Sequence, residues 1–322
     1  MTHRRESGLL LGLDGGSAKT AGVIITPEGR LLARARGRGS AIVGAPSAEA
    51  SSVLSSIVDS LCSQADASRD DIQSCGMGLS GIDFDDELPV QHEGIAAVLG
   101  IQQDHLFLVN DAIVALWGAT AKSAATLFQH GSGFTGGYRA RHGEEVLFDH
   151  LSIADTFDMR RALISLVARM INGMAEPTPL KERTLAHFGI EDEQEYCEAV
   201  YRHFIPSERR LRTPPLIFSS WLEGDPAAAS LVDRAIRDYA LAAKAMIAAT
   251  GSASPDVTFG GGVIARAPSE FWRLLSQRVR ESHPEVTVKP PDLLPEFGGA
   301  VMAGHHVGLD PMQLFQQLRV NA

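Results

Sequence analysis

The chain has 322 residues, of which 44% are hydrophobic and 21% are charged, and its formal net charge is −10. This length is sufficient for two domains, each with its own hydrophobic core. The acidic balance argues against general nucleic-acid binding, which needs lysine and arginine to neutralise phosphates. No apolar run reaches the ~20 residues of a membrane span, so we expect no membrane partner.

The cysteines give information about the compartment. Cys62, Cys75 and Cys197 are scattered along the chain and form no C-x-x-C pair. An odd and scattered set is typical of a reducing environment, and it does not indicate a disulfide scaffold or a metal cluster. We therefore expect a cytoplasmic protein in which each cysteine is a small apolar residue.

The first predicted element is a hairpin over residues 9–25, with the sequence LLLGLDGGSAKTAGVII. Two apolar runs predict two buried strands, and a turn of small and polar residues separates them. Gly15 and Gly16 have no Cβ atom, so the backbone there is able to turn sharply and present its N–H groups to a ligand. Three further residues of the turn carry donors suited to phosphate oxygens: Ser17, Lys19 and Thr20.

Asp14 ends the first of these strands and is the only acidic residue of the turn. A carboxylate beside bound phosphates is favourable only when a cation lies between them, and Mg²⁺ is the usual hard cation there. The alternative is an ordinary glycine hairpin with a solvated aspartate. This stretch alone leaves both interpretations open.

The elements predicted next alternate between strand and helix. In chain order they are a strand over 28–36, a helix over 48–66, a strand that breaks at Ser80 and Gly81, a helix over 86–99 and a strand over 106–109. Three antiparallel strands followed by alternating helices and strands imply a mixed sheet with helices on its faces.

Asn110 and Asp111 directly follow the strand over 106–109 and precede a predicted helix. Open α/β sheets bind their ligands at the carboxyl ends of strands, so Asp111 is a candidate site residue. The alternative is that Asp111 only caps the helix, a common position for aspartate.

The second half of the chain begins by repeating the first pattern. Residues 126–140 (TLFQHGSGFTGGYRA) read as strand, glycine turn and returning strand, and a third strand is expected from residue 144. This duplication predicts two related lobes whose glycine turns hold one ligand between them. We expect a hinge between the lobes near residues 118–123.

The remaining sequence is mainly helical until a last strand. Helices are predicted over 158–173, 180–189, 192–203, 214–223 and 226–250. A short strand then begins at residue 256 and ends in Gly260, Gly261 and Gly262, where a planar ring is able to approach the backbone closely. Residues 295–308 predict a helix with a face of small residues for tight packing.

The motifs LDGGSAKT, GLSG, VNDA, a second GSG turn, FGGGV and PEFGGAVMAG follow one another in this order. This order resembles the superfamily of actin, the heat-shock chaperone ATPases and the sugar kinases. Within it, the chain most resembles the N-acetylglucosamine kinase branch and the related ATPases that activate benzoyl-CoA reductase and hydroxyacyl-CoA dehydratase.

The resemblance implies an α/β, two-lobed actin-like ATPase (ribonuclease H-like) fold in which each lobe is a mixed sheet with flanking helices. The N-terminal lobe would comprise residues 1–120. The C-terminal lobe would comprise residues 121–322 and include a helical insertion. A homodimer is compatible with the resemblance, although the sequence does not fix the oligomeric state.

The implied reaction is transfer of the γ-phosphoryl group of ATP to a hydroxyl of a small sugar, with Mg²⁺. Asp14 would orient the metal ion, and Asp111 would take the proton from the acceptor hydroxyl. Phosphoryl transfer requires such charge neutralisation and such an oriented acceptor. The implied nucleotide-binding residues are Gly15, Gly16, Ser17, Lys19, Thr20, Gly131, Ser132, Gly133, Gly260, Gly261 and Gly262. The implied substrate-binding residues are Ser80, Gly81, Asn110, Asp111 and Asp149.

Three departures from the family pattern concern the substrate. His130 replaces the threonine of the usual Gly-Thr-Gly-Ser turn, and Ala41 stands where an asparagine reaches the sugar. The Gly-Asp-Glu-Gly-Ser segment corresponds to residues 148–152, where Asp149 is retained and His150 replaces the glutamate. We expect an amino sugar as substrate, N-acetylglucosamine or glucosamine. Because Ala41 offers no amide to an N-acetyl group, we expect no preference for the acetylated sugar.

Two alternative functions stay open at this point. The first is an ATPase that energises a partner reductase, although such activators hold an iron–sulfur cluster with clustered cysteines. The second is a sugar sensor that keeps the fold and has lost turnover.

Overall fold

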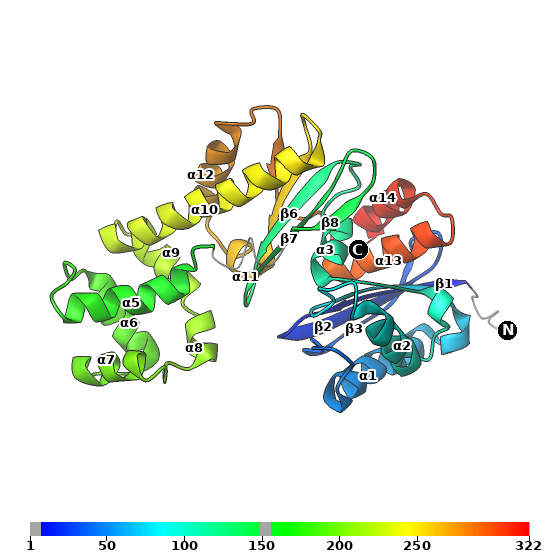
Figure 1. The fold of residues 1–322 in the computed structure, drawn as a ribbon, viewed down its shortest axis with the longest axis horizontal. Coiled ribbons are helices and arrows are strands. Elements are labelled where there is room, and N and C mark those ends of the chain that lie inside the picture. The colour runs from blue at the N-terminus through cyan, green and yellow to red at the C-terminus, as the bar shows by residue number, and fades with distance from the viewer. Residues whose placement is uncertain (1–7, 149–155, 322) are drawn as a thin grey trace.

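The computed structural model describes residues 8–148 and 156–321 (Figure 1). The fully buried strand β1 (Leu9–Gly15) pairs in antiparallel fashion with β2 (Lys19–Ile25), as the two apolar runs predict, and β3 (Leu31–Arg38) extends this meander. On the other side of β1, β4 (Ile72–Leu79) and β5 (Leu106–Val109) add in parallel. The resulting sheet has the order β3-β2-β1-β4-β5.

The second sheet repeats this topology. The antiparallel strands are β6 (Ala125–His130), β7 (Phe134–Arg139) and β8 (Glu145–Leu147). On the other side of β6, β9 (Asp256–Gly260) and β10 (Thr287–Lys289) add in parallel, which gives the order β10-β9-β6-β7-β8. The duplication expected from the two glycine hairpins is therefore confirmed, and each sheet is mixed.

Two helices of the first half connect strands of the first sheet, and a third leads from β5 to the second sheet. They are α1 (Ala48–Ala65), α2 (Leu88–Leu99) and α3 (Asp111–Ala119), with 3₁₀ turns at Arg69–Asp71 and Gln103–His105. Helix α1 begins where the Ser47 hydroxyl accepts a hydrogen bond from the amide of Ala50 at 3.1 Å. Its apolar residues, spaced three and four apart, pack on the first sheet, as expected for an amphipathic helix.

A helical insertion lies between β8 and β9; it extends away from the second sheet in Figure 1, except for its last and longest helix, which packs on that sheet. Its helices are α5 (Met159–Ile171), α6 (Pro179–Phe188), α7 (Glu193–Tyr201), α8 (Ser207–Leu211), α9 (Pro214–Leu222) and α10 (Pro226–Thr250). Asp225 caps α10 as predicted, because its side chain accepts hydrogen bonds from the Ala227 and Ala228 amides. None of the helices in the described ranges is both long and apolar enough to cross a membrane.

The last part of the chain contains α11 (Gly261–Ile264) and α12 (Ser269–Arg280), followed by α13 (Pro295–His306) and α14 (Pro311–Asn321). The last two helices return to the first lobe, where Phe297 and Leu314 share a core with Leu10 of β1. We therefore propose that the first lobe consists of residues up to 120 together with α13 and α14, and that the second lobe is the segment between.

Helix α13 lies directly against the backbone of its neighbours, as its face of small residues predicts. A Cβ atom at Gly298 would lie 2.2 Å from the Val114 carbonyl oxygen of α3, and one at Gly12 of β1 would lie 2.0 Å from the Glu296 carbonyl oxygen. No side chain fits at these positions, so the helix fixes the relative positions of β1 and α3.

Two chain segments connect the lobes and are hydrogen-bonded to each other. The amide of Asp292 donates to the carbonyl of Ala119 at 3.1 Å, and the amide of Leu293 donates to the carbonyl of Gly118 at 2.8 Å. Leu116 of α3 also belongs to the same buried apolar cluster as Leu127 of β6. The predicted hinge near residues 118–123 therefore lies where the two segments run side by side, and its motion stays a prediction.

We expect Gly298→Ala to destabilise the protein by ~1–3 kcal/mol, because its added methyl group overlaps the backbone of α3. Urea unfolding measures this loss. Gly262→Ala is the matched control, since no atom lies within 4 Å of a Cβ atom at Gly262. Equal unfolding free energies for Gly298→Ala and the wild type would contradict this packing.

Candidate active site

The carboxyl ends of β1, β4 and β5 meet at one edge of the first sheet. Asp14 of β1 lies opposite Gly78 of β4, and Gly78 lies opposite Val109 of β5. Asp111 follows β5, and a Cβ atom at Gly78 would lie 3.0 Å from the Asp111 Cα atom. The structure therefore brings Asp14 and Asp111 to the same edge.

Asp14 is a buried carboxylate with one nearby cation. It is 7% exposed, and its Oδ2 atom lies 3.7 Å from Nζ of Lys19. Burial raises the pKa of Asp14 to about 7; Lys19 acts to lower it, while the charges of Asp111 and Glu296 act to raise it further. A carboxylate in this environment is stabilised by a bound cation.

Glu296 is a third acidic residue close to this edge, and the sequence analysis did not single it out. It lies in the first turn of α13 and is fully buried. Its Oε1 atom accepts a hydrogen bond from Nη2 of Arg34 at 2.7 Å, and Nη2 of Arg36 lies 3.8 Å from the same atom. The two arginines on β3 therefore compensate a charge that lies on a distant part of the chain.

Asn110, and not Asp111, caps helix α3. The Asn110 side chain accepts a hydrogen bond from the amide of Ala112 at 2.8 Å and donates one to Oδ1 of Asp83 at 2.7 Å. Asp111 is the first helical residue, so the capping role considered for it belongs to its neighbour. Burial raises the pKa of Asp111 to about 6, and the charge of Asp83 adds to this effect.

The first glycine turn is held by backbone hydrogen bonds. The Gly16 amide donates to the Lys19 carbonyl at 2.9 Å, which closes the turn. The carbonyls of Gly15 and Gly16 accept hydrogen bonds from the amides of Ser80 and Ser40 at 2.8 and 3.0 Å. Within the described part of the chain, the amides at positions 17 and 18 have no hydrogen-bond partner, so they are free to bind an anion.

Thr20 does not present its side chain to a ligand. It is fully buried, and its hydroxyl donates a hydrogen bond to Oγ of Ser40 at 2.7 Å. Ser17 and Lys19, by contrast, are exposed. The predicted phosphate role of this turn therefore falls on its backbone and on Ser17 and Lys19.

The second glycine turn, between β6 and β7, has the same design. The Gly131 amide donates to the Gly133 carbonyl at 2.9 Å. No atom lies within 4 Å of a Cβ atom built at Gly131 or at Gly133, and neither residue has a positive φ. The fold itself therefore does not require glycine here, and the open space in front of the turn leaves room for a ligand.

The three glycines after β9 differ from one another. Gly261 has φ +83°, and a Cβ atom on it would lie 2.5 Å from the His130 backbone, so the fold requires glycine at this position. This contact places the end of β9 against the second turn. Gly262 faces open space, as expected for a residue beside a ligand.

Ser80 and Gly81 belong to a loop that contacts the first turn. The Ser80 carbonyl accepts a hydrogen bond from the Ile42 amide at 3.0 Å, so the segment that contains Ala41 is tied to this loop. Gly81 has φ +102°, and its carbonyl accepts a hydrogen bond from Gln91 at 2.9 Å. Asp149 and His150 lie outside the described residues.

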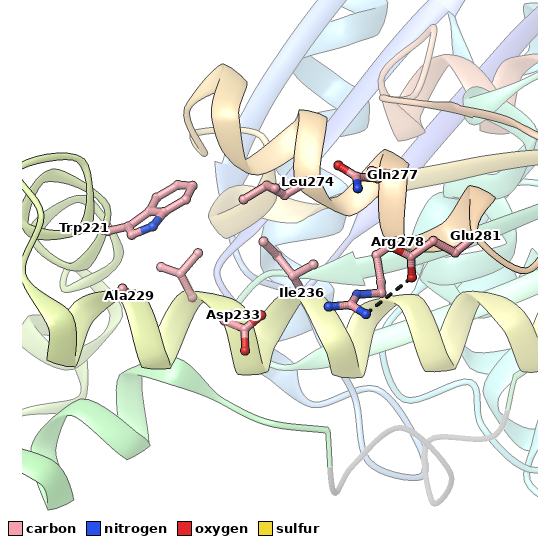
Figure 2. A pocket seen from close by; sticks show the side chains of 9 residues that line it. Trp221, Ala229, Asp233, Ile236, Leu274, Gln277, Arg278 and Glu281 are labelled. Carbon is pink, nitrogen blue, oxygen red and sulfur yellow. Dashed lines mark hydrogen bonds and ion pairs between the residues drawn. The ribbon is translucent and has the colours of Figure 1, made fainter.

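A separate cavity of about 100 Å³ lies between α10 and α12, with Trp221 at one end (Figure 2). Ile236 and Leu274 line it on opposite sides, and an ion pair between Arg278 and Glu281 lies at its other end. None of the predicted site residues lines this cavity. Ligand pockets usually have a volume of ~300–1,000 Å³, so this cavity is too small to hold a nucleotide.

The two sheets of equal topology, with a glycine turn and an acidic strand end in the first, define a two-lobed actin-like ATPase fold. The family model described as the BadF/BadG/BcrA/BcrD ATPase family matches residues 11–303. The chain therefore belongs to this family, and the resemblance stated from the motifs is confirmed.

Solved structures share this fold at low sequence identity. A candidate N-acetylglucosamine kinase from Chromobacterium violaceum aligns with a TM-score of 0.71 and 19% identity over 92% of this chain and 99% of its own. A second candidate N-acetylglucosamine kinase, from Porphyromonas gingivalis, aligns with a TM-score of 0.66 and 19% identity over 93% of this chain and 99% of its own. A ROK family glucokinase from Streptomyces griseus, solved in complex with glucose and AMPPNP, aligns with a TM-score of 0.53 and 19% identity over 92% of this chain and 98% of its own. No curated protein matches the chain significantly.

The raised pKa of Asp14 predicts a pH-dependent stability difference. Because the folded pKa of about 7 exceeds the ordinary aspartate value of 3.8, the folded state binds the proton more tightly and loses stability as the pH rises through this window. Asp14→Asn mimics the protonated form, so it should become more stable relative to the wild type between pH 5 and pH 8. Melting curves without metal or nucleotide measure this.

Asp86→Asn provides the control, because Asp86 is an exposed acid and its replacement removes the same charge. Its difference from the wild type should stay constant over this pH range. A constant difference for Asp14→Asn as well would show that Asp14 is not desolvated in the folded protein.

Proposed function

We propose that the protein is an ATP-dependent kinase that transfers the γ-phosphoryl group to a hydroxyl of a small sugar. The observation that carries this proposal is the pair of carboxylates, Asp14 and Asp111, at one strand edge beside a glycine turn with free amides. Phosphoryl transfer needs one carboxylate near the phosphates and their metal ion, and another at the acceptor.

Asp111 is our candidate for the general base. Asn110 is the cap of α3, and burial raises the pKa of Asp111 to about 6 although a hydrogen bond from the Ala112 amide acts to lower it. Asp111 is therefore ionised at neutral pH and close enough to neutrality to accept a proton effectively. The neighbouring Asn110 is fixed by Asp83 and by the helix, so the start of α3 is rigid. We propose that Asp111 accepts the proton of the sugar hydroxyl as the phosphoryl group is transferred.

Asp14 fits a Mg²⁺ site, because it is a buried carboxylate and Lys19 compensates its negative charge only in part. We propose that it holds the ion through oxygen ligands, which Mg²⁺ prefers. The ion would supply positive charge against the β- and γ-phosphates. Lys19 and the amides at positions 17 and 18 would bind phosphate oxygens from the first turn.

The second glycine turn and Gly262 would complete the nucleotide site on the other lobe. Both present open space to a ligand. The family to which the chain belongs consists of ATPases, and the S. griseus relative was solved with AMPPNP, which supports ATP as the phosphoryl donor. We also propose that the lobes close on the nucleotide at the hinge near residues 118–123, which would exclude water from the γ-phosphate.

For the acceptor we propose an amino sugar. The names of the C. violaceum and P. gingivalis relatives support this class, whereas the S. griseus glucokinase supports a plain hexose. Ser80, Gly81, Asn110 and Asp149 would bind the sugar. Because Ala41 provides no amide for an N-acetyl carbonyl, we propose that the enzyme does not favour the acetylated sugar.

An ATPase that energises a reductase is the second candidate. Cys62 and Cys75 are buried in the core of the first lobe, whereas Cys197 lies on α7 of the insertion. The three thiols therefore do not lie at one site within the chain, which argues against an iron–sulfur cluster bound by all three. The odd and scattered set of cysteines is typical of a reducing compartment, so we propose a cytoplasmic enzyme.

A coupled assay for ADP release, run with a panel of hexoses, hexosamines and polyols, tests the proposed function. We expect stimulation by an amino sugar or a hexose, with kcat/KM for N-acetylglucosamine no more than about tenfold above that for glucosamine. A larger preference for the N-acetyl sugar would contradict the role given to Ala41. ATP hydrolysis that no acceptor stimulates would contradict a sugar kinase.

Asp111→Asn should lower turnover by ~10²–10⁴, because it removes the base and retains the size of the side chain. Binding of nucleotide, measured by calorimetry, should stay close to the wild-type value. Asp86→Asn, which removes an exposed charge, should leave both quantities unchanged. Near-normal turnover of Asp111→Asn would limit Asp111 to a structural role at the start of α3.

A further inference from the structure

The two glycine turns differ in what holds their carbonyl groups. In the first turn, the carbonyls of Gly15 and Gly16 accept hydrogen bonds from backbone amides of neighbouring loops. In the second turn, the carbonyls of Gly131 and Ser132 both accept hydrogen bonds from the guanidinium group of Arg160, at 2.8 and 3.1 Å. One side chain thus takes the place of two backbone contacts.

Arg160 is held rigidly in this position. It is the second residue of α5, is 2% exposed, and makes a bidentate ion pair with the helix cap Asp158. The Nε–Oδ1 and Nη2–Oδ2 distances are 2.8 and 2.9 Å. Burial acts to raise the pKa of Asp158, but hydrogen bonds and charge from Arg160 lower it below its usual value. The pair therefore stays charged, and its planar geometry fixes the guanidinium group.

His130, which precedes the turn, contributes packing and no charge. Its ring is fully buried, stacks on Phe134, and bonds through Nδ1 to the Tyr239 hydroxyl. Burial and the charge of Arg160 lower the pKa of His130 to about 3, although Asp158 opposes them. The imidazole is therefore neutral at physiological pH, and Arg160 is the buried cation beside the turn.

The hydrogen bonds of Arg160 determine which groups of the turn are free. Because the carbonyls of Gly131 and Ser132 are directed to the guanidinium group, the turn is fixed from the side of α5. In the part of the chain that the structure describes, the amides of Ser132 and Gly133 have no hydrogen-bond partner, and the space beside Gly133 is open. Two fixed amide donors with open space in front form a site for phosphate oxygens.

We propose that Arg160 is a positioning residue for the second phosphate turn, acting through the Gly131 and Ser132 carbonyls to hold the Ser132 and Gly133 amides toward the nucleotide phosphates. This inference rests on the proposed nucleotide site. It assigns a function to the ion pair between Arg160 and Asp158, which joins the helical insertion to the nucleotide site. Arg160 itself touches no phosphate in this arrangement.

Arg160→Met and Arg160→Lys test the proposal, with calorimetric binding of adenosine and of AMPPNP in the presence of Mg²⁺ as the readout. We expect the affinity of each variant for AMPPNP to fall about tenfold to a hundredfold, because one or two charge-assisted hydrogen bonds that order the turn are lost. Adenosine affinity should change less than about twofold, since adenosine makes no phosphate contact. A purely structural role would weaken both ligands together.

Arg161→Met is the matched control. Arg161 is adjacent in sequence and its side chain is 75% exposed; its Nε atom lies 3.9 Å from Oδ2 of Asp158, which is too far for a hydrogen bond. This variant should bind AMPPNP and adenosine as the wild type does. Arg160→Lys keeps the charge and the aliphatic stem, so it decides the test if Arg160→Met does not fold.

Wild-type affinity for AMPPNP in a folded Arg160→Lys variant would overturn the proposal. Equal losses for adenosine and AMPPNP would also overturn it, because they would indicate general damage to the lobe. If the wild-type protein itself binds no AMPPNP, the proposed function fails, and that result is distinct from a failure of the Arg160 variants alone.

Discussion

The close contact of helix α13 with β1, β4 and α3 is the constraint on which the rest of the first lobe depends. It exists because glycines face each other across the interface: a Cβ atom at Gly76 would lie 2.1 Å from the Gly299 carbonyl, and one at Gly298 would lie 2.4 Å from the Gly118 amide. Backbones at this distance fix β1 relative to α3. Asp14 at the end of β1 and Asp111 at the start of α3 are thereby held at one edge.

Holding these acids together has an electrostatic cost. Burial raises the pKa values of both Asp14 and Asp111, and the charges of Asp111 and the buried Glu296 raise that of Asp14 further, while Lys19 opposes this only in part. A site optimised for stability alone would avoid such a cluster. Strongly perturbed carboxylates beside free backbone amides are typical of sites that bind a metal ion and perform proton transfer. The acids whose burial is unfavourable for stability are thus the groups that the proposed reaction requires.

The sequence predicted the features that depend on local pattern. Apolar runs around glycine turns identified both hairpins, and the small residues of 295–308 identified the tightly packed helix. It could not predict partners far apart in the chain, such as Ser40 for the Thr20 hydroxyl or Arg34 for Glu296. It also left open whether Asp111 is a site residue or the cap of α3, because aspartate is common at helix caps.

Arg160 shows what additional signal the sequence contained. A cation in the first turn of a helix is unfavourable with respect to the helix dipole, so Arg160, two residues after the capping Asp158, is a position where a specific partner is expected. The identity of that partner, two carbonyls of a turn 28 and 29 residues earlier, followed only from the structure.

The most direct test of the central claim follows the γ-phosphoryl group itself. ATP labelled with ¹⁸O in the γ-phosphoryl group would be incubated with the protein, Mg²⁺ and each sugar of the panel, and the products would be analysed by mass spectrometry. The account predicts a labelled sugar phosphate, formed by the wild type and lost in Asp111→Asn. Label found only in inorganic phosphate with every sugar would contradict it.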